Sequence, residues 1–462
     1  KLFLMSGLPN YHALKVDAAK CIGCTHCMKA CPTEAIRVID GLAVIDHERC
    51  VDCGQCHRSC PTQAFYVEQD DLTKIRAFKY RVILFPSIMI GQFPEKYNET
   101  QIYSGLKKVG FTHVFEVEQP IQLLIDSVNE YLRNEENPKP AISTYCPAIV
   151  RLIQGRYPSL TENLILRKAP HDLAAHFAIE RLLLEGAQRE EIGLFYATPC
   201  IAKIASVKSP VGERESIVDG IVNMNHLYNE VMKVISEVEA EDNSEQRQNL
   251  SEEGILWSQT RGESGHFGSR SIAIDGIHNV VRFLERLEND QVKGVDFLEL
   301  RACDQSCAGG ILLTGNRFLT VEKLERRAKR YPSAKDISES TIRVDIEELK
   351  QKLVIDSISP KPLFIFGKDR LKAMEKMTRA QRIVCSLPGI DCGACGAPNC
   401  HALAEDMVNN KAKMSDCIFL QQMWEDEGKI TARKALQNVQ KKWGNDRFKA
   451  DCNKRGRRNE GF

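Results

Sequence analysis

Short apolar runs and longer helical stretches alternate through the central part of the chain. The apolar runs predict buried strands at residues 81–85, 113–117, 192–197 and 297–300. The stretches around them predict helices at residues 101–109, 171–184 and 277–288. A polar stretch at residues 239–254 predicts a solvated surface loop. Strands that alternate with helices predict an α/β domain, to which we assign residues 79–361.

Residues 1–78 have a different pattern, in which short apolar segments separate two cysteine-rich loops. Residues 35–39 and 42–45 flank Asp40-Gly41, which predicts a strand–turn–strand hairpin. The cysteines follow the spacing C-x2-C-x2-C-x3-C-P, which occurs twice at an interval of about thirty residues. The eight are Cys21, Cys24, Cys27, Cys31, Cys50, Cys53, Cys56 and Cys60.

This spacing is typical of two [4Fe-4S] clusters. Three thiolates on a tight loop can hold three irons of one cluster, and the fourth thiolate, next to a proline, reaches the other cluster. We therefore assign one cluster to Cys21, Cys24, Cys27 and Cys60, and the second to Cys50, Cys53, Cys56 and Cys31. Two zinc sites are the disfavoured alternative, because zinc usually takes separated C-x-x-C pairs. Residues 16–67 resemble the bacterial two-cluster ferredoxins.

A second cysteine-rich module lies near the C-terminus, in residues 362–417. Gly393, Gly396 and Pro398 allow its loop to wrap tightly, and a helix at residues 401–410 precedes the last cysteine. The four expected ligands of a further [4Fe-4S] cluster are Cys392, Cys395, Cys400 and Cys417. The stretch resembles the small Fe–S domain of electron-transport flavin complexes and of corrinoid and sensory proteins. A structural zinc is the less favoured alternative.

After Cys417 the sequence predicts one long helix over residues 418–443, followed by a basic tail that ends at residue 462. Its apolar positions are Leu420, Met423, Ile430 and Leu436. This stripe needs a partner, so we expect a dimerisation or signalling helix rather than a simply packed terminal helix. Two cysteines remain unassigned: we expect Cys385 to be an ordinary buried thiol and Cys452 to lie in the tail.

Composition narrows the class of protein. A chain of 462 residues is expected to form more than one domain, and its 18 cysteines are spaced as metal ligands rather than as disulfide partners. A net charge of +1 gives no general attraction to nucleic acid or to anionic membranes. No apolar run is long enough to span a bilayer. These features predict a cytoplasmic iron–sulfur protein in a reducing compartment.

Four further cysteines are scattered through the α/β domain: Cys146, Cys200, Cys303 and Cys307. Each lies after a predicted strand or beside glycine or proline. Four thiolates suffice for one [4Fe-4S] cluster, and strand ends are where an α/β fold places its site. A lone cysteine is more often a small buried hydrophobic residue, so spacing alone leaves both interpretations open.

The segments STYCPA, TPCIAKIAS and ELRACDQSCAGG resemble, in order, the three signature loops of the catalytic domain of [FeFe]-hydrogenases. The resemblance covers most of residues 79–316. It implies that the four central cysteines hold the cubane of an H-cluster, and that Cys307 bridges it to a two-iron subcluster with CO and cyanide ligands. It also implies that Lys203 lies near a cyanide and that Glu299 keeps the acidic position of the family. Pro147, Thr198 and Ser306 are the remaining loop positions expected to contact the cofactor.

Several positions depart from the family pattern. Tyr145 replaces the cysteine that relays protons to the subcluster, and Ser206 replaces a relay glutamate. A phenol has a pKa near 10, against about 8.5 for a thiol, and should be a poorer shuttle. Thr198 and Arg301 replace methionines, and Ser306 replaces a glycine. Arg301 is expected either to lie near a cyanide or to be a surface ion-pair partner.

The sequence therefore predicts a multidomain α/β protein: a ferredoxin-like α+β module, an α/β hydrogenase domain and a small C-terminal Fe–S domain with a long helix. Its expected activity is reversible oxidation of dihydrogen and reduction of protons. Because the relay is altered, we expect it to be slow and to resemble the sensory subgroup, with a redox or signalling protein as partner and a possible homodimer. The alternative is a non-hydrogenase electron-transfer or signalling scaffold that lacks the two-iron subcluster.

Overall fold

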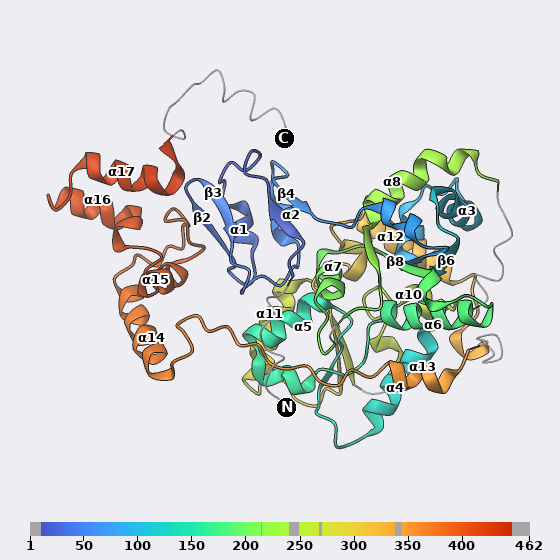
Figure 1. The fold of residues 1–462 in the computed structure, drawn as a ribbon. Coiled ribbons are helices and arrows are strands. Elements are labelled where there is room, and N and C mark those ends of the chain that lie inside the picture. The colour runs from blue at the N-terminus through green and yellow to red at the C-terminus, as the bar shows by residue number, and fades with distance from the viewer. Residues whose placement is uncertain (1–10, 214, 240–248, 268–269, 338–343, 446–462) are drawn as a thin grey trace. The chain divides into compact units, whose positions relative to one another are not determined.

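The computed structural model describes residues 11–213, 215–239, 249–267, 270–337 and 344–445. The chain divides into two compact units (Figure 1). Unit 1 comprises Lys1–Ala13, Val51–Gly54 and Val67–Pro362, and unit 2 comprises Leu14–Cys50, Gln55–Tyr66 and Leu363–Phe462. The four domain boundaries expected from the sequence remain predictions.

Unit 1 contains a four-stranded parallel sheet in the order β6-β5-β8-β9. The strands are β5 (Tyr80–Phe85), β6 (His113–Glu116), β8 (Ile192–Thr198) and β9 (Gly220–Asn223). Val82 pairs with His113 on one side and with Leu194 on the other. Every residue of β8 is buried, as expected of a central parallel strand covered on both faces. The predicted strands at 81–85, 113–117 and 192–197 are confirmed.

A second parallel sheet in unit 1 has the order β10-β11-β7. Its strands are β7 (Ala141–Ile142), β10 (Ser271–Ile274) and β11 (Phe297–Leu300). β11 is the middle strand, and all four of its residues are buried. The predicted strand at 297–300 is therefore confirmed, and it becomes the centre of a sheet.

The helices of unit 1 follow or separate these strands. They are α3 (Glu99–Val109), α4 (Ile121–Arg133), α5 (Pro147–Arg156), α6 (Pro170–Leu184), α7 (Ile201–Lys208), α8 (Met224–Val234), α10 (Glu252–Leu256), α11 (Ile277–Glu288), α12 (Arg317–Ala328) and α13 (Ile346–Lys352). The three predicted helices correspond to α3, α6 and α11.

The predicted loop at 239–254 is wrong at its C-terminal end, where α10 begins at Glu252. The Ser251 side chain accepts a hydrogen bond from the backbone N–H of Gly254 and caps this helix. Residues 240–248 of the predicted loop lie outside the described residues.

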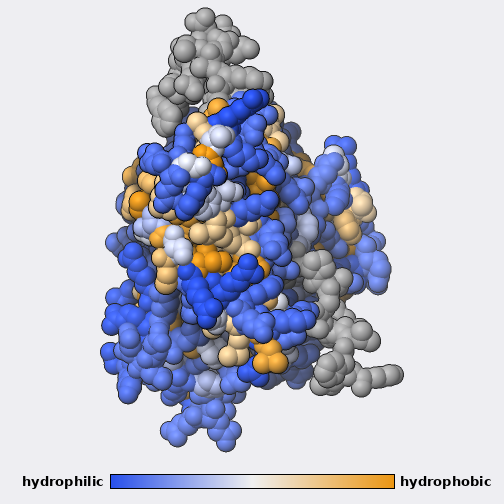
Figure 2. All heavy atoms as spheres, turned by 90° about the vertical axis from the view of Figure 1, so that its left-hand side faces the viewer, coloured by the Kyte–Doolittle hydropathy of each residue, from blue (hydrophilic) through white to orange (hydrophobic). Residues whose placement is uncertain are grey.

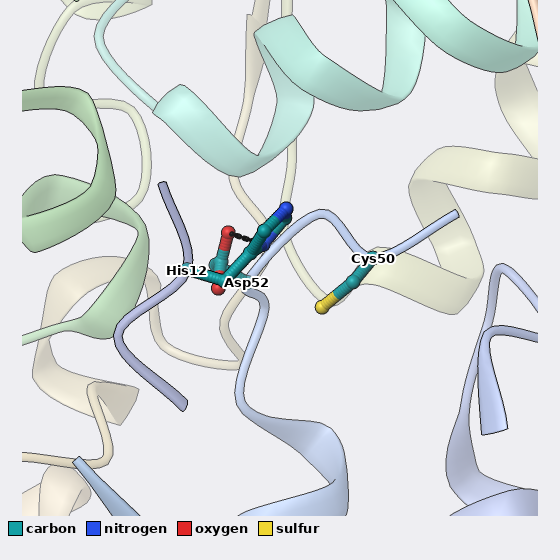
Figure 3. A group of neighbouring side chains, drawn as sticks. All are labelled: His12, Cys50 and Asp52. Atoms are coloured by element: carbon teal, nitrogen blue, oxygen red, sulfur yellow. Dashed lines mark hydrogen bonds and ion pairs between the residues drawn. The ribbon is translucent and has the colours of Figure 1, made fainter. Parts of the chain in front are cut away.

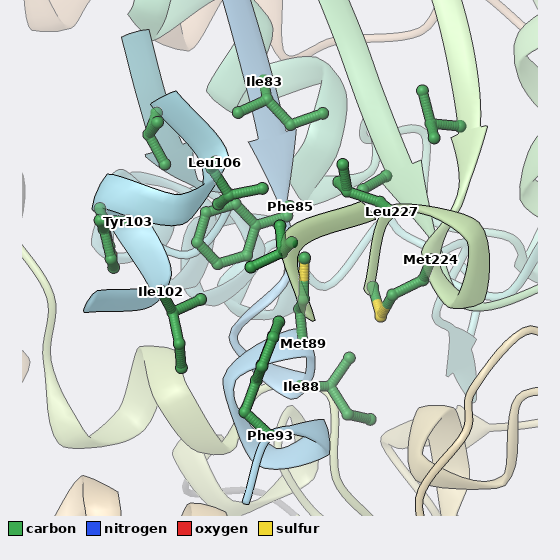
Figure 4. Close-up of a cluster of buried hydrophobic side chains, with 14 of the residues drawn as sticks. Ile83, Phe85, Ile88, Met89, Phe93, Ile102, Tyr103, Leu106, Met224 and Leu227 are labelled. Carbon is green, nitrogen blue, oxygen red and sulfur yellow. The ribbon is translucent and has the colours of Figure 1, made fainter. Parts of the chain in front are cut away.

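One apolar core packs α3 and α8 against the first sheet (Figure 4). Phe85 of β5 is fully buried and meets the Tyr103 ring of α3 edge-on at a centroid distance of 5.7 Å. Leu227 of α8 is likewise fully buried in this core. A second core surrounds α5 and α11 and includes residues of the second sheet. The two cores fix the strand ends from which the candidate site is built.

Unit 2 contains the expected ferredoxin-like elements. β1 (Leu14–Val16) pairs with β4 (Phe65–Val67), and β2 (Ile36–Ile39) pairs antiparallel with β3 (Leu42–Ile45). Asp40 and Gly41 form the hairpin turn, with φ angles of 50° and 77°. Two short helices, α1 (His26–Ala30) and α2 (Gln55–Ser59), carry cysteines. The predicted hairpin is confirmed.

The C-terminal part of unit 2 is helical. Its helices are α14 (Arg370–Cys385), α15 (Cys400–Val408), α16 (Ile418–Asp426) and α17 (Ala432–Trp443). The prediction of one long helix over 418–443 is wrong. Gly428 has a φ of 70°, and the Thr431 side chain caps the start of α17, so the chain turns between two helices.

Some apolar side chains of unit 2 remain exposed in the structure. Met423 of α16 is 45% exposed and Leu436 of α17 is 48% exposed. Cys385 is also exposed, so its prediction as a buried thiol is wrong. Figure 2 shows a face of the molecule on which apolar side chains gather among hydrophilic ones. Cys452 and the basic tail fall outside the residues that the structure describes.

Among the helices described, none is long and apolar enough to cross a membrane.

Candidate metal centre

The central cysteines lie where parallel strands end. Cys146 follows β7 and occupies the N-cap position of α5, with Pro147 buried in the first turn of that helix. Cys200 follows β8 and occupies the N-cap position of α7. The carboxyl ends of parallel strands are the usual location of functional residues in α/β folds.

Cys303 and Cys307 lie in the loop that follows β11. Cys307 belongs to the short 3-10 helix η7 (Ser306–Gly309), and the loop then packs against the Cys200 loop. The backbone N–H of Leu312 donates to the carbonyl of Pro199 at 3.0 Å. A Cβ on Gly310 would lie only 2.4 Å from that same carbonyl oxygen, so glycine is required for the approach.

The thiols of this group influence one another. Burial raises the pKa of Cys200, Lys203 lowers it, and the neighbouring Cys307 and Cys146 raise it, which together bring it to about 12. Burial also raises the pKa of Cys146. Buried thiols that crowd together resist ionisation unless a cation neutralises them, and iron binds thiolates. This set of donors therefore fits an iron–sulfur cluster.

Tyr145 lies directly beside the cysteine group. Its side chain is buried, and its hydroxyl oxygen is 3.5 Å from Cys307 Sγ. Two cations contact the ring: Lys203 Nζ is 4.1 Å and Arg301 Cζ is 3.8 Å from its centroid. Burial and the nearby Cys307 raise the pKa of Tyr145 well above its usual range.

Lys203, on α7, is a buried cation within this group. Burial lowers its pKa, but Tyr145, Tyr196 and the thiols of Cys307 and Cys200 oppose this effect, and the pKa is well above the usual value. A buried ammonium group is stable only beside negative charge. The site is therefore suited to a cofactor that carries negative charge.

Arg301 is also buried and forms ion pairs with two neighbouring carboxylates. Its Nη2 pairs with Glu263 Oε1 at 2.5 Å, and its Nε lies 3.5 Å from Glu299 Oε1. Arg301 is thus an ion-pair partner, but the predicted surface position is wrong because only 2% of the residue is exposed. Among the described residues, no hydrogen-bond partner is found for Arg301 Nη1. This buried N–H group is available to an acceptor on a cofactor.

Glu299 and Glu263 have different surroundings. The Glu299 carboxylate accepts hydrogen bonds from the backbone N–H groups of Arg261, Glu263 and Ser264 at 3.1, 3.1 and 2.9 Å. It therefore holds the loop that carries Glu263. The Ser143 hydroxyl donates to Glu263 Oε2 at 2.6 Å, and burial raises the pKa of Glu263 to about 6.

Sequence reasoning missed Glu263 and Ser143. Both line a small hollow that Tyr145, Arg167 and Lys168 also line. Glu263 comes close to Arg301 only through tertiary packing, and no local spacing pattern marks either residue.

The other predicted loop residues support the backbone in this structure. Thr198 Oγ1 accepts a hydrogen bond from the Cys200 N–H at 3.3 Å, and Ser306 Oγ lies 3.0 Å from Thr260 Oγ1. Ser206 is half-buried and donates to the Lys203 carbonyl at 3.0 Å. The cofactor contacts expected for Pro147, Thr198 and Ser306 remain predictions.

The ferredoxin-like cysteines have a repeated backbone geometry. Gly23 and Thr25 of the first motif have φ angles of 57° and 72°, and Asp52 and Gly54 at the equivalent positions of the second have 55° and 77°. Burial raises the pKa of Cys27 to about 12, with contributions from Cys24, Cys21 and Cys60. Cys27 therefore lies near the three cysteines assigned to the same cluster.

The segment Val51–Gly54 belongs to unit 1 and is anchored there by a buried ion pair. Asp52 is 2% exposed, and its carboxylate pairs with Arg151 of α5. The same carboxylate lies 2.8 Å from His12 Nδ1 (Figure 3). A Cβ on Gly54 would meet the Ile311 side chain at 3.0 Å. Val51 and Cys53 pack in the same apolar core as Cys146 and Cys200.

The four C-terminal cysteines are brought together in unit 2. Cys395 and Cys417 are buried, Cys400 is half-buried and Cys392 is exposed. Burial raises the pKa of Cys395 to about 11, and Cys392 and Cys417 contribute to the shift. Their donor set fits an Fe–S cluster.

Three family models match the chain. Residues 81–268 match "Iron only hydrogenase large subunit, C-terminal domain", residues 20–65 match "4Fe-4S dicluster domain", and residues 387–419 match "Putative Fe-S cluster". The second and third matches include all the cysteines of their regions, whereas the first includes Cys146 and Cys200 and ends before Cys303 and Cys307.

Two curated relatives are similar to parts of the chain. The periplasmic [Fe] hydrogenase large subunit of Nitratidesulfovibrio vulgaris is 30% identical over 215 residues, which is 42% of this chain and 50% of the relative. Iron hydrogenase 1 of Clostridium pasteurianum is 23% identical over 133 residues, 28% of this chain and 23% of the relative. The first match thus spans half of the relative's length.

A solved structure of a variant of the [FeFe]-hydrogenase from Chlamydomonas reinhardtii is 15% identical, with a TM-score of 0.44 over 62% of this chain and 96% of that chain. Taken together, these matches show that the central part of the chain is similar to the large subunits of iron-only hydrogenases, and that models of iron–sulfur domains match the chain on both sides of it.

Proposed function

We propose that the chain is a slow, sensory hydrogenase-type oxidoreductase that interconverts dihydrogen with protons and electrons. The observation that carries the proposal is the set of buried cations around the central cysteines. Lys203 and Arg301 both lie against the ring of Tyr145, whose hydroxyl is 3.5 Å from Cys307 Sγ, and Arg301 Nη1 has no hydrogen-bond partner within the described part of the chain. Two buried cations beside four thiols suit an anionic metal group.

The H-cluster would be held by Cys146, Cys200, Cys303 and Cys307, with Cys307 as the bridging ligand. The two-iron part of this group, when bound, supplies the metal chemistry that splits and forms dihydrogen. Lys203 and Arg301 would donate hydrogen bonds to its negatively charged ligands. Glu299 acts as a positioning residue in this proposal, because its carboxylate accepts three backbone N–H groups.

Proton transfer is the step that the chain performs poorly. The Tyr145 hydroxyl is the titratable group beside Cys307, and its pKa is well above 10, so it holds its proton at neutral pH. General acid–base catalysis is most effective when the pKa lies near the working pH. Ser206 has no carboxylate to extend a relay. Both features support low turnover.

Electrons would enter through the ferredoxin-like clusters. The segment that carries Cys53 packs in the apolar core that also contains Cys146 and Cys200. The Asp52–Arg151 ion pair and the Gly54–Ile311 contact hold this segment against the central domain. The packing of Cys53, one of the ligands assigned to the second ferredoxin-like cluster, beside Cys146 and Cys200 supports electron transfer to the central site.

The proposed setting is the cytoplasm, with a redox or signalling protein as partner and no role for nucleic acid. The exposed Met423 and Leu436 support a homodimer formed through α16 and α17, in place of the expected single helix. Sedimentation of the full chain tests this. A monomer at high concentration would contradict it.

A second candidate function is an Fe–S scaffold without the two-iron group. The Tyr145 ring favours it, because the ring covers one side of both Lys203 and Arg301 beside Cys307. In this alternative Tyr145 takes the place of cofactor ligands as the partner of the two cations.

Infrared spectroscopy on the chain matured by hydrogenase maturases decides between the two functions. The hydrogenase proposal expects CO and cyanide stretching bands that change under dihydrogen. Absence of these bands in a preparation with full [4Fe-4S] content would support the scaffold. If the bands are present, turnover as fast as that of metabolic hydrogenases would contradict the sensory part of the proposal.

A further inference from the structure

Within unit 2, the loop of the C-terminal cysteines contacts the first ferredoxin-like cysteine loop. A Cβ on Gly393 would lie 2.9 Å from Met28 Cε and 3.4 Å from Lys29 Cε, so these side chains rest directly on the glycine. Met28 is 1% exposed and follows Cys27, while Gly393 follows Cys392. Two cysteine loops therefore meet through one side chain.

Hydrogen bonds to the C-terminal cysteine loop hold the Met28–Gly393 contact in place. Lys29 Nζ donates to the Asp391 carbonyl at 2.9 Å, and Asp391 Oδ1 accepts from the Cys400 N–H at 2.7 Å. The Val38 N–H donates to the Gly396 carbonyl at 2.9 Å. Trp443 Nε1, at the end of α17, donates to the Ala394 carbonyl at 2.8 Å. Each bond ends on the segment between Asp391 and Cys400.

Two ion pairs hold the helix that follows the loop. Arg37 of β2 donates to both carboxylate oxygens of Asp406, at 2.6 and 3.3 Å. Arg49 Nη2 donates to Glu405 Oε2 at 2.9 Å. The four side chains are between 12% and 21% exposed, so the pairs are shielded from solvent. Bidentate, part-buried pairs give a defined orientation.

From this junction we propose that the C-terminal cluster exchanges electrons directly with the ferredoxin-like cluster assigned to Cys21, Cys24, Cys27 and Cys60. The Met28–Gly393 contact is the place of exchange. One electron passes from one site to the other; the donor site is oxidised by one electron, the acceptor is reduced by one, and no bond or proton changes. The C-terminal module would then report the redox state of the hydrogenase, so the inference rests on the proposed function for its biological role.

Electron paramagnetic resonance of the full chain, reconstituted with iron and sulfide and reduced with dithionite, tests the junction. Neighbouring reduced clusters broaden one another's signals, and the effect falls steeply with distance. Cys400→Ser removes a ligand of the C-terminal cluster. We expect it to abolish the additional broadening while the mutual interaction of the two ferredoxin-like clusters persists.

A second variant weakens the junction and keeps every ligand. In Glu405→Arg/Asp406→Arg both ion pairs become repulsive, so we expect the additional broadening to decrease with unchanged iron content. Arg379→Ala is the matched control, because Arg379 is an exposed residue of α14 in the same module. It should leave the spectrum unchanged.

The inference is overturned if the spectrum of the full chain equals that of Cys400→Ser plus a magnetically isolated cluster. It is also overturned if metal analysis finds zinc in place of iron at the C-terminal site. Neither result depends on the two-iron group. Missing CO and cyanide bands together with the expected broadening would contradict only the hydrogenase proposal.

Discussion

The guanidinium carbon of Arg301 lies 3.8 Å from the centre of the Tyr145 ring, and the hydroxyl of that ring lies 3.5 Å from Cys307 Sγ. A cation this close to an aromatic face is attracted by the ring quadrupole, more strongly in a desolvated site. Arg301 and Tyr145 therefore stabilise each other. Two of the departures from the family pattern therefore form one structural pair beside Cys307.

Restoring the proton relay should raise turnover. We expect Tyr145→Cys combined with Ser206→Glu to increase hydrogen oxidation about 100-fold, the order of magnitude that general acid–base catalysis contributes. The physical reason is that a thiol and a carboxylate ionise nearer neutral pH than a buried phenol and a hydroxyl. Dye-linked hydrogen uptake by fully matured protein measures the change.

Tyr145→Phe provides the comparison for this variant. It removes the hydroxyl and keeps the ring against Arg301, so turnover should stay at the unmodified level. No gain in the restored double variant, with infrared bands intact, would contradict our account of the slow relay.

Removing the Arg301 charge should destabilise unit 1. Arg301→Ala leaves Glu263 and Glu299 buried without their cation, at an expected cost of roughly 3 kcal/mol in the free energy of unfolding. Denaturant unfolding of the metal-free chain measures it. In Arg301→Ala/Glu263→Gln the loss should be smaller, because one unpaired carboxylate is gone. Equal losses of stability in the single and the double variant would argue against the ion pair between Arg301 and Glu263.

Stability should fall as the pH rises through the ionisation of Glu118. Burial and the neighbouring Glu116 raise the pKa of Glu118 to about 8 from an ordinary 4.5. A carboxyl group whose pKa is raised on folding favours the folded state when it is protonated, so its contribution is lost between about pH 4.5 and 8. At about 1.4 kcal/mol per pKa unit, we expect Glu118→Gln to gain roughly 3–5 kcal/mol above pH 8.

Glu253 provides a control of opposite sign for this experiment. Its pKa is lowered despite partial burial, because the Ser333 hydroxyl and the Ala334 N–H donate to its carboxylate. Glu253→Gln should therefore reduce stability near neutral pH, and the loss should disappear in acid. Unfolding curves at several pH values distinguish the two residues. Parallel pH profiles for unmodified chain and Glu118→Gln would refute the assignment.

A further prediction concerns the Asp52–Arg151 ion pair that anchors the Val51–Gly54 segment. Asp52→Ala leaves Arg151 buried without its carboxylate, so unit 1 should lose roughly 3–5 kcal/mol of stability. His12→Ala should cost less, because the charge pair with Arg151 remains. Thermal unfolding of both variants checks the order, and a larger loss in His12→Ala would contradict it.

Local hydrophobic patterns in the sequence predicted some helices and strands to the residue. Helix α11 and strand β11 begin and end at the predicted residues, because their apolar faces are buried in the cores of unit 1. The cysteine loops were predictable for a different reason: three ligands lie within seven residues, so their grouping needs no tertiary information.

The sequence did not predict features that depend on contacts between distant residues. Glu263 acquires its surroundings from Ser143, 120 positions earlier, and from the buried Arg301. The helix predicted across Gly428 fails because the stop depends on a left-handed residue and a Thr431 cap, which the hydrophobic spacing does not register. Cys385 was expected to be buried because most lone thiols are, yet it ends α14 at the surface.

The parallel pairing of β11 with β7 joins distant parts of the chain and therefore determines when the central site can form during synthesis. Tyr145 and Cys307 are 162 positions apart, so their site does not exist until most of unit 1 has been synthesised and closed. The ferredoxin-like cysteines, in contrast, all lie between residues 21 and 60 and are synthesised before any of the central cysteines. We therefore expect iron to bind the ferredoxin-like cysteines earlier in translation than the central cysteines, whose site forms only when unit 1 has folded.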